Sequence, residues 1–482
     1  MIVSHWYKLV SLLGLCLNSY FVPSAVAQNS LAKQSQQSCD RNLAWEIAGV
    51  INRPQLRRAR WGIEIQTLAG EPVYSLEGDK FFNPASAAKL LVSAAGLLEL
   101  GANYRLKTPI YSQGKPPVLE SLRVEGRGDP SISSQSLKNI VHQLQQVGVE
   151  QIDNLIIDDR YFPAPGIDPT WEWGDIHSYF ATAVNSAILN ENSVRLTLLP
   201  QEVGQPVEFF WNDAIAARQW RVVNQATTGP ADLEYDVAID GDLGLPLLKL
   251  RGELAVNEPP DIWDLAVVDP ASYFLESLRL HLERGGIVVK RGTVLERGDR
   301  KTNDTELTAI YAPPLQTLVA EINQNSNNLY AEALGKILAR KLNIDTSVEA
   351  IEHSLERIGI ESAEYKLVDA SGLSRQNLVT PQTLVKLLRL MSQSALGRDY
   401  RQSLAEGGVN GTLKKRLDVA PRGQIWAKSG TLTGVGALSG YLSRDDITLV
   451  FAILVNNSEL ENKAIRQAID EIVTIANRFS QC

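Results

Sequence analysis

The sequence has little cysteine, methionine or histidine. It holds three cysteines, two methionines and five histidines in 482 residues. So few cysteines exclude a fold held by a disulfide network. Lysine and arginine number 47 against 55 acidic residues, a formal net charge of −8, and no long basic run occurs. This acidic balance argues against nucleic-acid binding. The 44% hydrophobic and 21% charged residues are typical of a globular chain with about two to four domains.

Metal-binding and cofactor motifs are also missing. The sequence has no His-Glu-x-x-His or paired-cysteine zinc motif. It has no Gly-x-Ser-x-Gly motif to accompany its histidines, so a Ser-His-Asp hydrolase is disfavoured. We therefore expect no metal and no cofactor.

Residues 1–27 have the pattern of a secretory signal peptide. Lys8 precedes the apolar run Leu9–Leu17, and Ala25-Val26-Ala27 supplies small residues for a cleavage site. The run is shorter than the ~20 residues that span a bilayer, and no later stretch is long and apolar enough. We expect an exported protein, periplasmic or extracellular, without an integral membrane segment after cleavage. An uncleaved anchor is the alternative.

The two ends of the chain predict one antiparallel sheet with helices packed on its faces. Strand patterns with period-two alternation or turn residues flank helix patterns at both ends. The expected strands are 61–66, 73–76, 424–431, 437–443 and 447–455, and the expected helices are 85–100 and 459–479. From about 105 to 300 the chain holds mainly short strand-like runs and two helix candidates, 136–147 and 271–282. This indicates β-rich material inserted into an outer α+β domain.

The first chemical motif is Ser86-Ala87-Ala88-Lys89. Asn83 and Pro84 are typical of a helix start, where free N–H groups and the positive dipole end lie. Lys89 follows Ser86 by one turn, and a buried lysine can lose enough basicity to take a proton from a serine. Two other Ser-x-x-Lys matches, at 30–33 and 112–115, lie in polar or turn-rich stretches. Ser86 is therefore the candidate nucleophile, with a surface lysine on a helix as the alternative.

Two further motifs follow in order. Ser326-Asn327-Asn328 stands in an amide-rich stretch before a helical run, and helix capping alone also explains it. Lys428-Ser429-Gly430 lies on an expected strand, where Gly430 lets another backbone or a ligand approach closely. An exposed lysine before a turn glycine is the alternative. Together, the three motifs form the combined signature of β-lactamases and penicillin-binding proteins.

The chain resembles the D-alanyl-D-alanine carboxypeptidase/endopeptidases of the class C low-molecular-mass penicillin-binding proteins. The resemblance covers nearly all of the chain after residue 27. Asn327 and Ser429 replace an aspartate and a threonine that are common in the family. Further motifs similar to the family's occur at 126–130, 157–162, 369–375 and 411–413.

The resemblance implies an α+β fold of the penicillin-recognising, β-lactamase-like type with inserted domains. It assigns a catalytic domain to 40–104 and 300–482, and an inserted domain II to 105–190 and 264–299. A nested domain III would occupy 191–263.

The resemblance also implies a mechanism without a cofactor. Ser86 would attack the bond between two D-alanines of a peptidoglycan stem peptide, and Lys89 would take its proton. Ser326 and Lys428 would carry the proton to the leaving amine, and Asn328 would hold the peptide amide. β-Lactam antibiotics would acylate the same serine.

Substrate binding is assigned to the last motif and to two charged segments. Ser429, Gly430 and Thr431, next to Lys428, would hold the terminal carboxylate. Thr431 and Ser86 would give the backbone N–H groups of an oxyanion hole. Two charged positions would complete the substrate site. Asp158 or Asp159 would pair with a free amine of the cross-linking residue, and Arg375 would lie with it.

Two thiols, Cys39 and Cys482, remain after signal removal. If the first and last helices pack side by side, an oxidising compartment would let these cysteines join. Free thiols on mobile termini are the alternative.

Other functions stay open at this stage. A serine β-lactamase uses the same three motifs, although the long insertion argues against it. The alternative outside the enzymes is a non-catalytic peptidoglycan-binding or adhesion protein, because Arg-Gly-Asp occurs at 127–129 and 297–299.

Overall fold

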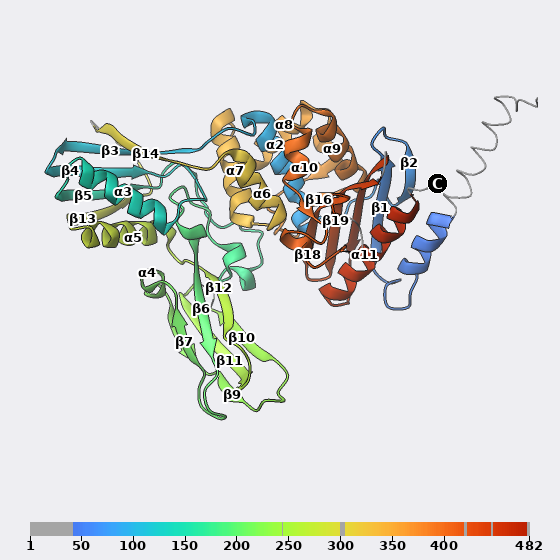
Figure 1. Cartoon of the computed structure of the whole chain (residues 1–482), viewed down its shortest axis with the longest axis horizontal. Helices are drawn as coiled ribbons and strands as arrows, with labels where there is room; N and C mark the ends of the chain where they lie inside the picture. The colour runs from blue at the N-terminus through green and yellow to red at the C-terminus, as the bar shows by residue number, and fades with distance from the viewer. Residues whose placement is uncertain (1–41, 243, 299–303, 419–421, 445–446, 480–482) are drawn as a thin grey trace, which may run out of the picture.

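The computed structural model describes residues 42–242, 244–298, 304–418, 422–444 and 447–479. The predicted signal segment and the cysteine pair Cys39 and Cys482 lie outside the described residues. Figure 1 shows a helix-covered sheet at one end, a second sheet at the other, and a β-rich arm projecting from between them.

The first sheet joins the two ends of the chain. Its six strands lie in the order β17-β18-β19-β20-β1-β2, and all five pairs are antiparallel. They are β1 (Arg60–Thr67), β2 (Pro72–Leu76), β17 (Ala405–Glu406), β18 (Ile425–Leu432), β19 (Val435–Arg444) and β20 (Ile447–Asn456). β20 connects the two halves of the sheet because it pairs with β19 on one side and with β1 on the other.

Helices cover both faces of this sheet. The helix over 42–51 and α11 (Asn462–Phe479) pack on the face that carries Phe451 and Ile453. The helices of the other core are α2 (Lys89–Leu100), α6 (Leu315–Gln324), α7 (Asn328–Leu342), α8 (Ser347–Glu356), α9 (Pro381–Gln393) and α10 (Gly397–Gln402). Because both faces are covered, β20 is apolar almost throughout instead of alternating. The predicted α+β fold class is confirmed.

The second sheet belongs mainly to the insertion. Its order is β13-β5-β4-β3-β14, with β4, β5 and β13 parallel. Its members are β3 (Lys107–Lys115), β4 (Val118–Glu125), β5 (Gln151–Asp158), β13 (Val288–Leu295) and β14 (Thr305–Tyr311). The helices α3 (Ser134–Gln146) and α5 (Pro270–Arg284) precede β5 and β13, as parallel pairing requires a crossover. β14 pairs with β3, although it falls in the segment 300–482 that the sequence assigns to the catalytic domain.

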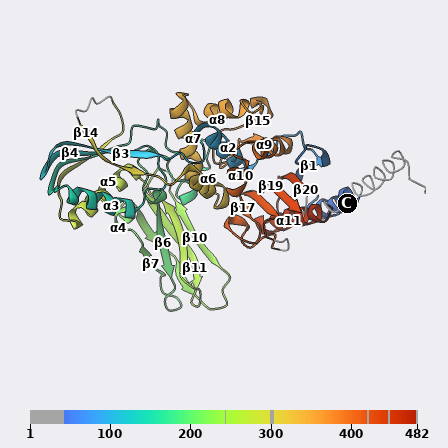
Figure 2. The ribbon, with the colours of Figure 1, turned by 45° about the horizontal axis from the view of Figure 1, so that its top comes forward.

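The projecting arm consists of two small sheets. Figures 1 and 2 both show it standing away from the rest of the molecule. One sheet is β12-β6-β7 and the other is β10-β11-β8, with β9 also paired to β11. The elements are β6 (Ser193–Leu199), β7 (Glu208–Trp211), α4 (Ala214–Ala217), β8 (Arg221–Asn224), β9 (Thr227–Gly229), β10 (Asp236–Gly241), β11 (Leu247–Ala255) and β12 (Asp261–Ala266).

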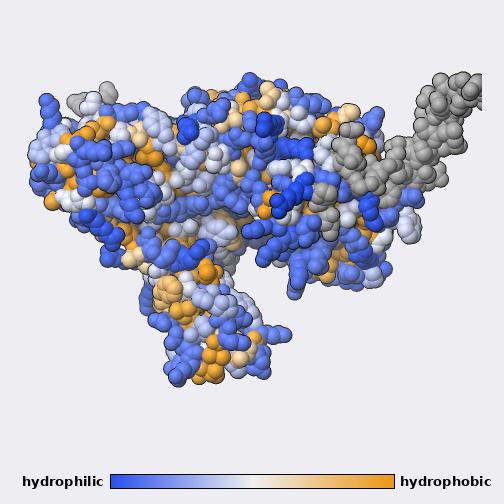
Figure 3. Space-filling model, in the orientation of Figure 1, coloured by the Kyte–Doolittle hydropathy of each residue, from blue (hydrophilic) through white to orange (hydrophobic). Residues whose placement is uncertain are grey.

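The surface carries mixed polarity. On the face seen in Figure 3, hydrophilic residues dominate and hydrophobic ones stand in small separate groups, some of them on the arm. Within the described ranges, no helix combines the length and the apolar character needed to cross a bilayer. A short two-stranded sheet of β15 (Tyr365–Lys366) and β16 (Leu378–Val379) flanks the loop 367–377.

Candidate active site

Ser86 lies in a tight turn rather than in an α-helix. The residues Ala85–Ala88 form a 3-10 turn, and the α-helix α2 begins only at Lys89. Ala85 has a φ of +44°, a left-handed conformation that is rare for residues other than glycine and prevents a regular α-helical start. The Asn83 side chain accepts the N–H of Ala85 at 2.8 Å, but the predicted cap at Asn83 is wrong, because Pro84 is the N-cap of this turn and Ala88 is that of α2. The turn holds Ser86 at the head of a buried helix.

Lys89 is completely buried beside the serine. Its Nζ donates to Ser86 Oγ at 3.0 Å, to Asn328 Oδ1 at 2.6 Å and to the Ser371 carbonyl at 2.5 Å. Burial lowers the pKa of Lys89 to about 7, although the charges of two acids, Asp369 and Glu332, act in the opposite direction. A large fraction of Lys89 is therefore neutral at neutral pH and able to accept a proton.

Ser326 occupies the turn between α6 and α7. It has a φ of +63°, and Asn327 caps α7 by accepting the N–H of Tyr330. This turn brings Ser326 Oγ within 2.9 Å of the Nζ of Lys428 on β18. Lys428 is fully buried, and burial together with the nearby charge of Lys89 holds its pKa well below the usual range. The Ser326–Lys428 pair thus lies beside the Ser86–Lys89 pair, close enough for the charge of one lysine to lower the pKa of the other.

The strand β18 packs directly against the serine turn. A Cβ atom at Gly430 would stand 2.7 Å from the Pro84 carbonyl oxygen and 3.0 Å from the Ser86 nitrogen. The predicted close approach at Gly430 is therefore to the backbone of this turn. The neighbouring Ser429 donates its hydroxyl to Thr412 Oγ1 at 2.7 Å.

A cleft of about 460 Å³ opens over these groups. Its lining includes the predicted residues Ser86, Ser326, Asn328, Arg375, Ser429 and Thr431. The segment before β6 contributes further lining residues: Glu172, Asp175, Tyr179 and Phe180. The amide of Asn328 donates to the Phe180 carbonyl at 2.7 Å, which ties the inserted segment to the catalytic motif.

Arg375 reaches the cleft from the loop between β15 and β16. Its Nε lies 3.0 Å from Glu172 Oε1, and its Nη1 donates to the Thr433 carbonyl at 3.1 Å. Asp175 lies close enough to Glu172 and Arg375 for both charges to affect its pKa. Burial and Glu172 raise the pKa of Asp175, while His177 and Arg375 oppose the rise. Glu172 and Asp175 are not among the site residues predicted from the sequence. The acid-rich, tryptophan-rich stretch Asp168–Asp175 is the signal that could have found them.

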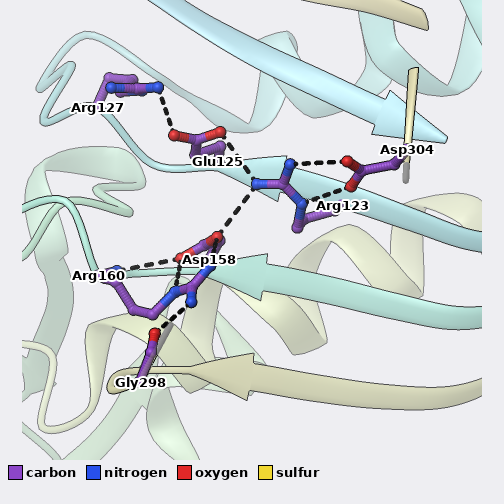
Figure 4. A network of polar contacts seen from close by, with 7 residues as sticks. All are labelled: Arg123, Glu125, Arg127, Asp158, Arg160, Gly298 and Asp304. Carbon is purple, nitrogen blue, oxygen red and sulfur yellow. Dashed lines mark hydrogen bonds and ion pairs between the residues drawn. The ribbon is translucent and has the colours of Figure 1, made fainter. Parts of the chain in front are cut away.

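Asp158, which the sequence assigns to the substrate site, does not line the cleft. It ends β5 and is only 3% exposed. Arg160 donates to it at 2.6 Å and Arg123 at 3.1 Å, in a network that also holds Asp304 (Figure 4). Burial alone would raise the pKa of Asp158, but its hydrogen bonds from Arg160 and the charge of Arg123 outweigh burial and lower it. Its partners are internal, so it has a structural role in the five-stranded sheet.

Asp159 is also occupied by its own chain. It accepts the N–H groups of Ser186 and Ala187 at 2.7 Å each, and the hydroxyl of Ser186 at 2.8 Å. These bonds fix the loop that follows the cleft-lining segment. Asp159 therefore shapes the insertion without lining the cleft.

The Arg-Gly-Asp sequence at 127–129 is not displayed as an adhesive loop. Asp129 is 1% exposed, and the Arg127 guanidinium pairs with Glu125 and stacks over Tyr161. The second copy, at 297–299, ends in a residue outside the described ranges.

A serine activated by a buried lysine, with a second serine–lysine pair beside it, defines a serine hydrolase of the penicillin-recognising type. Residues 43–478 match the model of the D-Ala-D-Ala carboxypeptidase 3 (S13) family. The chain belongs to this family and is a serine D-Ala-D-Ala carboxypeptidase. The predicted family and enzyme class are thereby confirmed.

Individual relatives agree with this membership. The D-alanyl-D-alanine carboxypeptidase of Actinomadura sp. (strain R39) is 30% identical over 436 residues, which cover 86% of this chain and 80% of the relative. The penicillin-sensitive carboxypeptidase A of Dictyostelium discoideum is 26% identical and covers 84% of each chain. The crystal structure of penicillin binding protein 4 (dacB) from Haemophilus influenzae has the same fold, with a TM-score of 0.78 and 21% identity. The match covers 90% of this chain and 99% of that one.

Proposed function

We propose that the chain cleaves the bond between the two D-alanines of peptidoglycan stem peptides through an acyl-enzyme on Ser86. The observation that carries this proposal is the 3.0 Å contact between Ser86 Oγ and the Nζ of Lys89, whose pKa is about 7. At this distance a neutral amine takes the hydroxyl proton as the oxygen attacks.

The remaining groups supply the rest of the reaction. As the bond from Ser86 Oγ to the carbonyl carbon forms, the proton passes to Lys89. The peptide C–N bond then breaks, and the same proton leaves Lys89 and reaches the leaving amine through Ser326, which is hydrogen-bonded to Lys428 at 2.9 Å. Water attacks the acyl-enzyme, releases the shortened peptide with a new carboxyl group and restores the Ser86 hydroxyl. No redox or metal step enters this balance.

Groups at the cleft are placed to bind the carbonyl oxygen of the scissile bond and the terminal carboxylate that follows it. The N–H groups of Ser86 and Thr431 would form the oxyanion hole, since β18 lies against the serine turn at Gly430. Ser429 and Thr431, which line the cleft, would hold the terminal carboxylate beside the neighbouring Lys428. Asn328 would orient the peptide amide.

The far end of the cleft would bind the charged end of the stem-peptide side chain. Arg375 suits a carboxylate there, and Glu172 and Asp175 suit an amine. Glu172 and Asp175 therefore replace Asp158 as the proposed acidic partners of the substrate amine. We expect Arg375→Ala and Glu172→Gln to slow cleavage of an amine-bearing stem peptide about tenfold or more while acylation by penicillin stays within ~3-fold. Equal losses on both substrates would contradict this assignment.

The decisive experiment is gel detection of a fluorescent penicillin on wild-type protein and on Ser86→Ala. We expect the label on wild type only. Ser112→Ala is the matched control, because Ser112 also precedes a lysine by three residues but lies in the strand β3. Labelling that survives in Ser86→Ala would refute the acyl-enzyme assignment. Release of D-alanine from a stem peptide, measured in parallel, separates a peptidase from a β-lactamase, which would instead release hydrolysed penicillin rapidly.

The arrangement of sheets supports a division of the chain close to the one expected. We propose a catalytic unit built on the six-stranded sheet, an inserted unit built on the five-stranded sheet that also takes β14, and the arm as the nested unit at about 191–263. Export by the segment 1–27 to the cell wall, the site of its substrate, completes the proposal. Mass measurement of the mature N-terminus tests it, with cleavage expected after Ala27.

A further inference from the structure

Glu332 is a buried acid on α7 that takes no direct part in the reaction described above. Its side chain is 7% exposed, and it follows the catalytic Asn328 by one helical turn. We infer that Glu332 is a positioning residue that holds the proton acceptor Lys89 through the backbone of the loop 369–375. The inference rests on the proposed function, in which Lys89 takes the proton of Ser86.

The hydrogen bonds run from Glu332 to Lys89 through a single residue. Glu332 Oε1 accepts the backbone N–H of Ala370 at 2.9 Å and that of Ser371 at 2.7 Å. The carbonyl of the same Ser371 accepts the Nζ of Lys89 at 2.5 Å. A shift of the Ser371 backbone therefore moves one of the three acceptors that aim the Lys89 amine.

The loop has carboxylates in place of regular backbone partners. Asp369, which is 2% exposed, accepts the N–H groups of Gly372 at 2.7 Å and Ser374 at 2.6 Å. It also accepts the indole N–H of Trp171 from the inserted segment at 2.9 Å. Buried N–H groups need such partners, so the two acids together determine the shape of the loop.

The loop also touches the turn that carries the nucleophile. Gly372 has a φ of +81°, and a Cβ atom there would stand 2.0 Å from the Ala85 carbonyl oxygen. A loop this close to the serine turn cannot shift without moving the backbone next to Ser86. Glu332 therefore supports both members of the Ser86–Lys89 pair.

Positioning depends on the acceptor oxygen of Glu332 rather than on a negative charge. Burial raises the pKa of Glu332 to about 8, the charges of Asp369 and Asp168 add to the rise, and the Ser371 N–H opposes it. Lys89 and Lys336 are the cations facing this acid, and Lys428 faces Lys89 from β18. A glutamine, whose carbonyl accepts the same two N–H groups, should therefore replace the glutamate.

The test compares Glu332→Gln with Glu332→Leu in the full chain, using a fluorescent penicillin as the probe. We expect the glutamine variant to acylate within ~3-fold of wild type. The leucine variant, of similar volume but without an acceptor, should acylate about 10- to 100-fold more slowly, since small displacements of reacting groups cost factors of this size. Labelling at long times should reach the same stoichiometry in all three proteins, which separates a slow site from an unfolded one.

A second readout distinguishes positioning from packing. Loss of the Ser371 acceptor removes a hydrogen bond to the Lys89 ammonium, so its pKa falls and the acid limb of the acylation pH profile moves to lower pH in the leucine variant. The glutamine variant is the reference for this shift, because it also lacks the charge of Glu332 but keeps the acceptor. A residue needed only for packing would leave the limb of the leucine variant where the glutamine variant has it. If the leucine variant does not fold, Glu332→Asp, which withdraws the acceptor by one methylene, should show the same shift and slowing.

Acylation at the wild-type rate in the leucine or aspartate variant would overturn the inference, as would a glutamine variant as slow as leucine. Failure of the proposed function looks different, because wild-type protein would then take no label on Ser86.

Discussion

Gly430 and Pro84 approach so closely that a side chain between them has no room: a Cβ atom on the glycine would stand 2.7 Å from the proline carbonyl oxygen. The contact places β18, which carries Lys428, directly against the turn that carries Ser86. It explains why the last motif carries a glycine, and it makes the glycine a sensitive position.

Gly430→Ala should slow acylation by penicillin about tenfold or more and destabilise the fold by ~1–3 kcal/mol, because β18 and the serine turn must move apart. Gly49→Ala is the matched control. Gly49 lies in the helix over 42–51, where a Cβ atom meets nothing within 4 Å, so alanine there should be neutral or slightly stabilising. Labelling kinetics and thermal melts check both. Wild-type acylation in Gly430→Ala would show that the close contact is not needed.

The acylation rate should depend on pH through Lys89. The amine accepts a proton only in its neutral form, and the pKa of Lys89 is about 7. The second-order rate constant should therefore fall about tenfold for each pH unit below 7 and level off above it. Lys89→Arg should take no label at any pH between 5 and 9, because a guanidinium keeps its proton. A rate independent of pH over this range would rule out Lys89 as the base.

Asp158→Asn should destabilise the protein without changing its chemistry. The carboxylate is buried between Arg123 and Arg160, and breaking such a network leaves buried charge unpaired at a cost of ~3 kcal/mol. Asp153→Asn, on the same strand but in a more exposed pair with Lys290, should cost less than ~1 kcal/mol. Denaturant unfolding measures the cost, and penicillin labelling should be equal in both variants. Slower labelling in Asp158→Asn alone would show that Asp158 contributes to the active site.

The same carboxylate predicts acid sensitivity. The pKa of Asp158 is lowered in the folded protein, so its stabilising contribution is complete above the ordinary value of about 3.8 and is lost as the pH falls through the folded value. The stability difference between wild type and Asp158→Asn should therefore shrink below about pH 3.8. A difference that stays constant into strong acid would exclude this linkage.

The pair Cys39 and Cys482 stays a prediction. Nearby described residues support it, since Arg478 of α11 pairs with Glu46 of the helix over 42–51 at 2.8 Å. A bond across so long a loop would stabilise the fold by up to ~5–6 kcal/mol in the chain-entropy model. Alkylation of the denatured, unreduced protein followed by mass measurement should add no alkyl group to the mature chain. Two added groups would refute the bridge.

The sequence by itself determined the catalytic motifs and the class of fold. Ser86 and Lys89 are one turn apart, so their proximity is local and readable from spacing. The apolar run of β20 and the cap at Asn327 are local as well. Even here the backbone departs from the expected helix, because Ala85 beside Ser86 has a left-handed φ, and its carbonyl lies against the loop at Gly372.

Only the tertiary structure decided which acids serve the site. Asp158 and Glu172 look equally available in the sequence, but Asp158 is enclosed by Arg123 and Arg160, whereas Glu172 faces Arg375 in the cleft. The motif at 369–375 is visible in the sequence, but the role of the Ser371 carbonyl in holding Lys89 is not, since every residue has a carbonyl group. Contacts between residues hundreds of positions apart depend on how the sheets and the insertion pack, and neither periodicity nor motif spacing encodes that packing.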